Sequence, residues 1–413
     1  MIMIDEKIEK LILDNQSLLD IEFKKIDELA KINSLKVLNA FINNKVSESH
    51  FASSSGYGYG DIGREVIEMV FAEVLGSEDA LVRNQFISGT HALSVCLFSL
   101  LRPGDLLLSI TGKPYDTLDE VIGITPNDSS LMSYNICYDQ FDLIADDFDY
   151  KKIEYYLKKS QVKVIAIQRS KGYAKRKSIT LEKLENVIKF IKKIDDNVIV
   201  MVDNCYCEFV GAFEPTNIGA DIMVGSLIKN LGGGIAPNGA YIAGRKNLIH
   251  LCSQGLNVPG QGKEVGPTLN INKSFLQGLY MAPSVVASAL KTSILASLVM
   301  AKLGYEVEPK YNDERADIVL AITFNDPDKL MNFISGIQEA SAIDAHAHLE
   351  ACTMPGYKDK IMMASGSFTS GSSIELSCDG PLKKPYIAYL QGSLTYEYGC
   401  IAIKHAVSKI TKG

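Results

Sequence analysis

The first part of this 413-residue chain lacks the residues that interrupt helices. No glycine occurs before Gly56 and no proline before Pro103. Apolar residues such as Ile8, Leu19 and Leu35 recur there at a spacing of three to four, with charges between them. This pattern predicts a helical arm over residues 1–55. Its apolar stripe must pack against the rest of the chain or against another subunit.

Paired cysteines and long uncharged runs are also missing. The eight cysteines show no CxxC spacing, and the opening MIMIDEKIEK carries charges where a secretory signal needs an apolar core. We therefore expect reduced thiols and a cytoplasmic protein. The most apolar stretch, residues 280–301, contains Lys291 and several hydroxyl side chains. A membrane span needs about 20 nearly uncharged residues, so this stretch is expected to be a buried helix and no membrane partner is expected.

Positive charge is scarce, and arginine especially so. The 42 Lys and Arg residues against 49 Asp and Glu give a net charge of −7, which disfavours a nucleic-acid partner. Only seven residues are arginine, and none follows Arg315. An apolar content of 46% and a charged content of 22% exclude collagen-like, low-complexity and disulfide-scaffold chains.

Strand-like and helix-like segments alternate between residues 80 and 245. The expected strands are 81–87, 105–110, 162–168, 198–203, 221–227 and 239–243, and the expected helices include 89–101, 150–160 and 180–194. This order predicts an α/β domain with a mainly parallel sheet. The runs VKVIAI and NVIVMVD are continuously apolar, as in strands covered on both faces.

The remaining segments complete the expected domain organisation. Residues 232–266 are rich in glycine and are expected to be loop, and a long helix is expected over 285–303. Residues 305–413 contain further strands (318–324 and 374–376) and helices (328–340 and 396–410), which predict a smaller α+β domain. A single core rarely exceeds about 250–300 residues. We therefore predict a helical arm over 1–55, a large α/β domain over 56–284, and a linking helix with a small domain over 285–413.

A GxGxxG pattern over residues 58–63 resembles a dinucleotide-binding fingerprint. That motif requires a preceding strand and a βαβ unit, and the serines at 53–55 supply neither. The interpretation favoured here is a loop leading into a helix over 64–75. Tyr57, Tyr59 and Arg64 lie in or beside this loop and could donate hydrogen bonds to an anion.

Two side chains follow neighbouring buried strands. Asp203 ends the run VIVMVD, and Lys229 closes the segment Ser226-Leu-Ile-Lys before three glycines. Alone, Asp203 would be read as a cap and Lys229 as a loop residue, although desolvation would favour the neutral, nucleophilic amine. Together they have the layout of a pyridoxal 5′-phosphate (PLP) site. There a lysine forms a Schiff base with the aldehyde, and a carboxylate keeps the pyridine nitrogen protonated.

Two more pieces fit such a site. The segment Ser88-Gly89-Thr90 directly follows an expected strand and opens an expected helix, and a helix N-terminus favours a phosphate. The same residues would also serve as an ordinary N-cap. Tyr115 follows the expected strand 105–110 at the same sheet edge and could stack on the cofactor ring; otherwise it is a tyrosine in a surface turn.

These pieces, in this order, resemble fold type I PLP-dependent enzymes of the methionine γ-lyase and cystathionine β-lyase-like family, also called aluminium resistance proteins. The matching stretches are SSSGYGYGDIGR (53–64), SGTHAL (88–93), GKPYDTLDEVIG (112–123), IQRSKGY (167–173), VDNCYCEFV (202–210), GADIMVGSLIKNLGGG (219–234) and SGSSIELSCDGPLKKPY (370–386).

The resemblance implies a role for each residue of the site. Lys229 would be the Schiff-base lysine, Asp203 would pair with the pyridine nitrogen and Tyr115 would lie over the ring. The phosphate ligands would be Gly89, Thr90 and Ser226. Tyr57 or Tyr59, with Arg64, would reach the phosphate of a neighbouring subunit. This arrangement implies a homodimer or a homotetramer with the active site at the subunit interface.

The implied activity is carbon–sulfur lyase chemistry on a sulfur-containing amino acid, which gives a thiol, a 2-oxo acid and ammonia. Another PLP-dependent reaction, such as transamination or aldol cleavage, and a PLP-binding protein without lyase activity are the alternatives. Related lyases bind the substrate carboxylate with a C-terminal arginine, which this chain lacks. The candidate replacements are Arg315, Lys383 and Lys384. Arg169 and Tyr173 are further candidates for contact with the substrate or the cofactor.

Metal and thiol chemistry are not expected. Asp344, His346 and His348 have a spacing that could hold a metal ion, but no further ligands are evident. Cys205 and Cys207 follow Asp203 closely, and no histidine that could activate them is visible nearby in the sequence. We therefore expect no metal, and we expect both thiols to be structural.

Overall fold

The computed structural model describes residues 2, 4–174, 176–353 and 359–411. Its centre is a seven-stranded sheet in the order β1-β7-β6-β5-β4-β2-β3. The strands are β1 (Asp79–Arg83), β2 (Leu106–Ser109), β3 (Cys137–Gln140), β4 (Val162–Gln168), β5 (Ile199–Asp203), β6 (Ile222–Ser226) and β7 (Ala240–Gly244). Strands β3, β2, β4, β5 and β6 pair in parallel, and only β7 runs antiparallel to its neighbours. The predicted mainly parallel sheet is confirmed.

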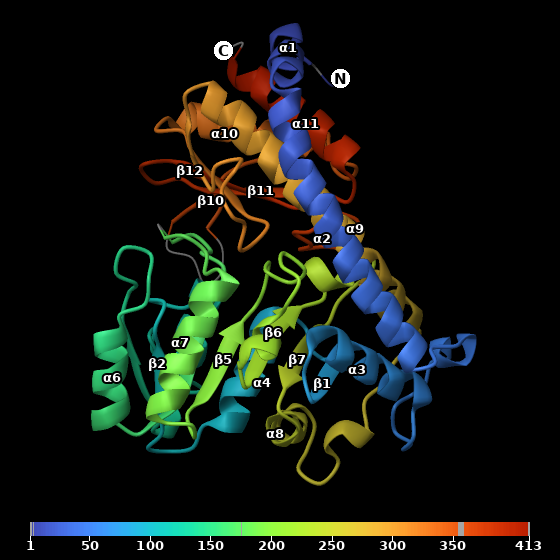
Figure 1. The fold of residues 1–413 in the computed structure, drawn as a ribbon, viewed down its shortest axis with the longest axis vertical. Helices are drawn as coiled ribbons and strands as arrows, with labels where there is room; N and C mark the ends of the chain where they lie inside the picture. Colours follow the sequence, from blue (N-terminus) through green and yellow to red (C-terminus); the bar gives the residue numbers. More distant parts are fainter. Residues whose placement is uncertain (1, 3, 175, 354–358, 412–413) are drawn as a thin grey trace.

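Helices cover both faces of this sheet (Figure 1). They are α3 (Ile62–Leu75), α4 (Gly89–Leu100), α5 (Asp119–Ile122), α6 (Tyr150–Lys159), α7 (Leu181–Ile194) and α8 (Lys246–Leu256). The apolar residues of α3 and α7 belong to one buried cluster, and those of α4 and α8 belong to a second. Two clusters on one sheet explain why its central strands read as continuous apolar runs.

The N-terminal arm is helical, as predicted, and consists of α1 (Glu6–Asp14) and α2 (Gln16–Asn43). Helix α2 lies along α9 (Asn272–Lys302), as Figure 1 shows. The Asn33 amide donates to the carbonyls of Phe209 and Gly211, at 3.2 and 3.1 Å. The arm therefore packs on its own chain. It still exposes large apolar side chains on its other side, namely Leu13, Ile21, Ile32, Leu35, Leu38 and Ile42.

A second, five-stranded sheet follows α9, in the order β10-β11-β12-β9-β8. Its strands are β8 (Glu306–Glu308), β9 (Leu320–Thr323), β10 (Ile361–Ala364), β11 (Ser377–Pro381) and β12 (Ile387–Gln391), all paired antiparallel. Helices α10 (Pro327–Glu339) and α11 (Tyr396–Thr411) pack together beside it. This confirms the predicted α+β character of the C-terminal part, while the exact domain limits stay predictions.

Three local predictions are wrong. The long helix begins at Asn272 and not at 285, because Pro283 is tolerated inside α9. The stretch 232–266 is not simply loop, since it contains β7 and helix α8. The strand expected at 374–376 begins instead at Ser377. In each case packing in the folded chain outweighs a local composition signal.

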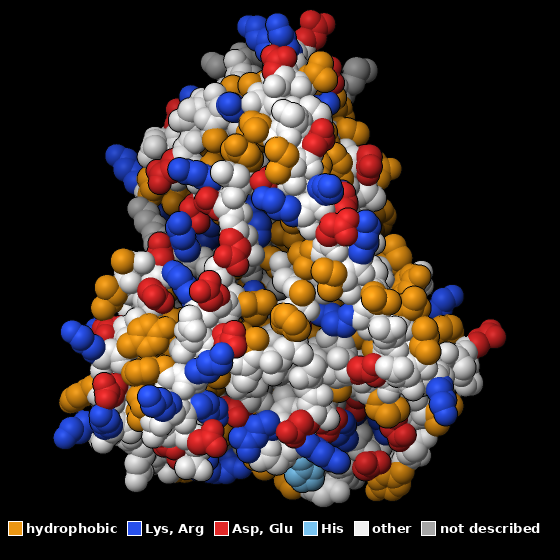
Figure 2. Space-filling model, viewed as in Figure 1, with side chains coloured by type: hydrophobic (Ala, Val, Ile, Leu, Met, Phe, Trp, Pro, Cys, Tyr) orange, Lys and Arg blue, Asp and Glu red, His pale blue; other side chains and the backbone are white. Residues whose placement is uncertain are grey.

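Helix α9 is long and apolar enough to cross a membrane, but 78% of its most apolar window is buried inside the molecule. This agrees with the predicted buried helix. Figure 2 shows that positive and negative side chains are interspersed over the face in view. That face therefore carries no single-signed field of the kind that attracts polyanions.

Candidate active site

One pocket lies at the carboxyl ends of β4, β5 and β6, against the first turn of α4. This edge is where open α/β sheets bind their ligands. Its lining consists of Ser88, Gly89, Thr90, Leu93, Tyr115, Thr117, Gln168, Ser170, Gly172, Asp203, Cys205, Tyr206, Ser226, Ile228 and Lys229. The structure thus brings together six residues that the sequence proposes for one site: Gly89, Thr90, Tyr115, Asp203, Ser226 and Lys229.

The carboxylate of Asp203 stands at the last position of β5, between β4 and β6. Its Oδ1 accepts a hydrogen bond from the Cys205 backbone N–H at 3.1 Å. Burial raises the pKa of Asp203, while Lys229 and this N–H partly offset that effect. Among the described residues no cation lies within ion-pair distance of it. The site therefore holds a carboxylate ready to pair with a cationic ligand group.

Lys229 follows β6 and turns its amine toward the pocket, 3.9 Å from the centre of the Tyr206 ring. Burial by itself lowers the pKa of Lys229. The neighbouring Cys205, Tyr206 and Asp203 outweigh burial, so the net pKa is raised. Burial therefore favours the neutral amine, as expected from the sequence, whereas the neighbouring groups favour the charged one. The amine must lose its proton before it can act as a nucleophile.

The backbone around Lys229 requires glycine. A Cβ on Gly232 would lie 1.6 Å from the Leu227 carbonyl oxygen, and one on Gly233 would lie 2.3 Å from the Gly278 carbonyl oxygen. These contacts are too close for any side chain. The glycines that follow Lys229 in the sequence thus let its loop fold tightly against α9.

Helix α4 presents its N-terminus to the pocket. Ser88 is the N-cap, and its hydroxyl accepts from the His91 N–H at 3.1 Å. A Cβ on Gly89 would lie 3.2 Å from the Cβ of Ser226, so glycine permits a close approach of the helix to β6. The Thr90 hydroxyl meets that of Thr117 at 2.7 Å. Free N–H groups of a first helical turn, together with these hydroxyls, form a cup of donors of the kind that suits an anion.

Aromatic side chains form one side of the pocket. Tyr115 lines it, and the ring of Tyr173 lies 6.2 Å from the ring of Tyr115. Tyr173 in turn contacts Tyr389 of the C-terminal sheet at 4.8 Å and donates its hydroxyl to Asp379 at 3.1 Å. The aromatic side of the pocket is therefore linked to the small domain.

Several candidates for contact with the substrate or the cofactor lie outside this pocket. Arg169 is 2% exposed and turns away from the pocket, where it bonds Asn204 Oδ1 and the carbonyls of Ile179 and Cys207. In a strand, successive side chains point to opposite faces. The residue before it, Gln168, lines the pocket instead.

The C-terminal candidates are also outside the pocket lining. Arg315 donates to the Ser293 hydroxyl at 2.7 Å, beside α9. Lys383 forms an exposed ion pair with Asp359 at 2.8 Å, and Lys384 is exposed. Arg315 and Lys383 are bonded to other groups, and Lys384 lies at the surface. All three side chains are therefore away from Lys229. No arginine or lysine other than Lys229 lines the pocket in the described part of the chain.

The loop with the GxGxxG pattern is not preceded by a strand, in agreement with the interpretation favoured above. Tyr57 and Tyr59 are 87% and 73% exposed, and neither reaches the pocket of its own chain. Arg64, by contrast, is 3% exposed, and its guanidinium donates to the carbonyls of Glu264 and Gly266. In this conformation Arg64 is unavailable to a neighbouring subunit, because its guanidinium is buried in its own chain.

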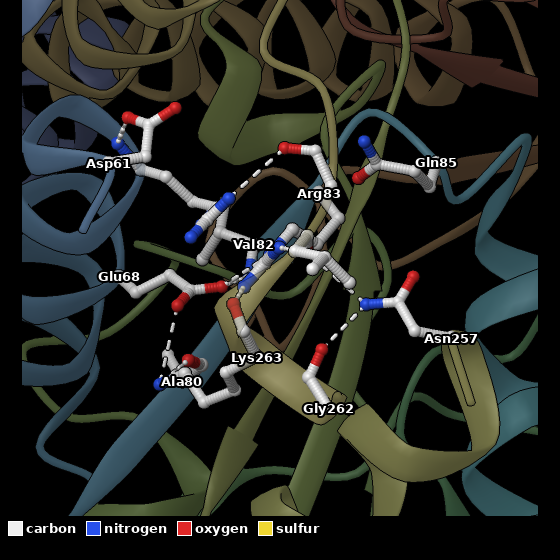
Figure 3. A network of polar contacts seen from close by, with 12 residues as sticks. Asp61, Glu68, Ala80, Val82, Arg83, Gln85, Asn257, Gly262 and Lys263 are labelled. Carbon is white, nitrogen blue, oxygen red and sulfur yellow. Dashed lines mark hydrogen bonds and ion pairs between the residues drawn. The ribbon is translucent and has the colours of Figure 1, made fainter. Parts of the chain in front are cut away.

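A polar network around Arg83 and Glu68 holds the segment 262–267 (Figure 3), and Arg64 donates to two carbonyls of the same segment. Arg83 forms a buried ion pair with Glu68 at 2.6 Å and donates to the carbonyls of Lys263 and Val265. Since these bonds use backbone carbonyls, they fix the shape of the segment whatever its side chains are. The loop that carries Tyr57 packs on this segment, where the Gly266 N–H donates to the Gly56 carbonyl at 2.9 Å. The network thus positions the exposed tyrosines.

Sequence reasoning missed several side chains of the pocket, including the polar ones of Thr117, Gln168, Ser170 and Tyr206. Gln168 ends β4 at the same edge as Asp203, so strand alternation would have selected it. Tyr206 has a φ of +72°, which is uncommon for a residue other than glycine. The thiol of Cys205 also lines the pocket, whereas Cys207 is buried outside the lining. No cluster of three or more metal-ligating side chains occurs among the described residues.

Comparison with known proteins identifies the relationship. The model of the methionine gamma-lyase family matches residues 8–411. The chain belongs to this family. A curated relative is the uncharacterized protein YnbB of Bacillus subtilis, which is 46% identical over 390 residues and is covered over 92% of its length, against 94% of this chain. The solved structure of a carbon-sulfur lyase involved in aluminum resistance from Clostridium novyi is 46% identical, with a TM-score of 0.95 over 98% of this chain and 96% of that one.

More distant structures share the fold alone. Cystathionine gamma-lyase from yeast has a TM-score of 0.62 at 15% identity, with 92% of this chain and 98% of that one covered. A methionine gamma lyase from Micromonospora echinospora has a TM-score of 0.58 at 15% identity over 86% of this chain and 87% of that one. The fold is therefore that of the fold type I PLP-dependent enzymes, as the sequence predicts.

Proposed function

We propose that this protein is a PLP-dependent carbon–sulfur lyase that acts on a sulfur-containing amino acid. The observation that carries the proposal is the meeting of Lys229, Asp203 and the N-terminus of α4 in one pocket. Family membership and the Clostridium novyi carbon-sulfur lyase support it. The proposal extends to the products, which are a thiol, a 2-oxo acid and ammonia.

The residues present fit PLP. The α4 cup with Gly89, Thr90 and Ser226 suits a phosphate dianion, and Asp203, without a cation of its own, suits a protonated pyridine nitrogen. Tyr115 lies where a planar ring can stack. When bound, PLP supplies an electron sink for the carbanion chemistry of amino acids.

Within this arrangement the side chains of the chain have distinct tasks. Lys229 would hold the cofactor aldehyde, and its freed amine would then take the proton from the substrate α-carbon. Asp203 would keep the ring nitrogen protonated and so stabilise the negative charge that develops. Thr90 and Ser226 would fix the phosphate end, so that Lys229 and the substrate meet in a constant geometry.

Product analysis separates this activity from the alternatives. The purified protein, supplied with PLP, is incubated with L-methionine, L-cystathionine and S-alkyl-L-cysteines, and thiol, 2-oxo acid and ammonia are quantified. We expect the three products in equal amounts from at least one substrate. A new amino acid formed from an added 2-oxo acid, without thiol, would instead identify an aminotransferase.

We further propose that the active unit is a homodimer or a homotetramer in the cytoplasm, with Tyr57 or Tyr59 of one subunit reaching the phosphate of another. Their exposure, on a loop held by the Arg83 network, supports this arrangement. The eight unpaired cysteines fit a reducing compartment.

The double variant Tyr57→Phe, Tyr59→Phe tests the shared site. We expect it to weaken PLP binding about tenfold or more, because a hydrogen bond to a charged group contributes about 1.5–3 kcal/mol. Its melting temperature without cofactor should stay unchanged, since both side chains are exposed. Tyr155→Phe, at an exposed tyrosine on α6, serves as the control. Unchanged PLP affinity in the double variant, or a monomer in light scattering, would contradict the proposal.

A further inference from the structure

The small domain places a buried carboxylate close to the pocket. Asp379, on β11, is 7% exposed. Its Oδ2 accepts from the Tyr173 hydroxyl at 3.1 Å and from the Gln391 amide at 3.2 Å. Both donors are neutral, and among the described residues no Lys, Arg or His lies within ion-pair distance of Asp379. The charge of this carboxylate is therefore not balanced by its immediate neighbours.

Asp379 lies near enough to Lys229 for the two charges to interact. Burial raises its pKa to about 7, against the opposing effects of Tyr173, Gln391 and the Lys229 ammonium. The Tyr173 ring that holds it packs against Tyr115, which lines the pocket. The carboxylate thus lies behind the wall of the pocket, joined to it through the Tyr173 ring.

Three other buried acids of this protein have partners for their charge or for both oxygens. Glu68 pairs with Arg83 at 2.6 Å, and Asp221 pairs with Lys192 at 2.7 Å. Glu375 carries no cation, but its two oxygens accept the N–H groups of Phe368 and Thr369. Asp379 differs from all three, because its Oδ1 neither accepts a hydrogen bond from the described residues nor is fully enclosed. One oxygen is left for a ligand.

Asp203 offers a parallel within the same site. It too is a carboxylate without a cation in ion-pair distance, and under the proposed function its partner is a protonated ring nitrogen. A buried carboxylate is costly while it is charged, so it either takes a proton or pairs with a cation. The described residues place no cation within ion-pair distance of Asp379, so a ligand ammonium would stabilise its charged form.

We propose that Asp379 determines substrate specificity by binding a second ammonium group, carried by the part of the substrate that leaves with the sulfur. The substrate class is then a thioether amino acid with a distal amine. This proposal rests on the proposed function for the identity of the reacting group. Tyr173 and Gln391 are positioning residues, because they orient the carboxylate without contacting the substrate ammonium themselves.

Two compounds of matched shape test the proposal. S-(2-aminoethyl)-L-cysteine and S-propyl-L-cysteine differ by an ammonium in place of a methyl group. For the wild-type holoenzyme we expect kcat/KM to favour the aminoethyl compound by at least about 30-fold, mainly through KM, as expected for a desolvated charge pair. In Asp379→Asn this ratio should fall below about threefold. In Ser377→Ala, which removes another partner of Gln391 but no charge, the ratio should persist.

A binding measurement tests the role of Asp379 independently of the proposed lyase activity. Calorimetric titration of the holoprotein with both compounds should show the same preference, even if neither compound is cleaved. Absence of thiol release from any sulfur amino acid would overturn the proposed function alone. If the wild-type protein binds the two compounds equally well, Asp379 does not have the proposed role, and this measurement requires no variant. If folded Asp379→Asn still prefers the aminoethyl compound, the proposed role of Asp379 is likewise wrong.

Discussion

Replacing Lys229 with alanine is expected to lower the rate of thiol release by at least about a thousandfold. The variant loses both the amine that holds the cofactor aldehyde and the base that removes the substrate α-proton, and general acid–base catalysis alone contributes about 10²–10⁴. The yellow absorbance of the protein-bound cofactor should disappear as well. Thiol release and the visible spectrum of the purified variant, prepared with added PLP, are the measurements.

A matched lysine provides the control. Lys36 also lies over an aromatic ring, 5.0 Å from the centre of Phe209, but it stands outside the pocket lining. Lys36→Ala should therefore keep the absorbance and the activity, apart from any loss of stability. Turnover in Lys229→Ala within tenfold of the wild type would show that the reaction uses another group.

Replacing Asp203 with asparagine is expected to lower kcat by about 10²–10³-fold while much of the cofactor stays bound. Asparagine is nearly the same size, but it cannot stabilise a proton on the ring nitrogen, so the ring accepts electrons poorly. The phosphate cup at α4 is untouched by this change, which is why binding should suffer less than catalysis. The measurements are kcat and the amount of PLP retained after gel filtration.

A conservative variant distinguishes charge from structure. Asp203→Glu keeps the carboxylate, so its kcat should be at least about tenfold higher than that of Asp203→Asn. If both variants are equally impaired and equally unstable, Asp203 serves the fold rather than the cofactor. If Asp203→Asn is fully active, the assignment of the pyridine partner is wrong.

The main sheet and most of the central site can be predicted from the sequence for a simple physical reason. Strands β4, β5 and β6 are buried on both faces, so they appear as apolar runs, and their carboxyl ends must meet at one edge. Asp203 and Lys229 come directly after two such runs. The order of the segments therefore predicts that Asp203 and Lys229 lie close together. It also predicts that the helix beginning at Gly89 lies near them.

The position of the small-domain residue Asp379 cannot be predicted from the order of strands in this way. Asp379 lies in the antiparallel sheet, and its distance from Lys229 depends on how that sheet packs on the loop after β4. Arg64 shows a related limit. Its partners are the carbonyls of Glu264 and Gly266, which any residue could supply, so no side-chain pattern reveals them. Gln168 ends β4 just as Asp203 ends β5, so its place at this edge can be predicted from the sequence, whereas Arg169 follows the strand and the sequence does not reveal its buried partners.

The most direct test of the central claim is the chemical identification of the residue that carries the cofactor. The holoprotein is reduced with borohydride, digested and mapped by mass spectrometry, with Lys229→Ala as the parallel sample. The account predicts a phosphopyridoxyl group on Lys229 of the wild-type protein and no labelled lysine in the variant. A label on another lysine, or none on a protein that still releases thiol, would contradict it.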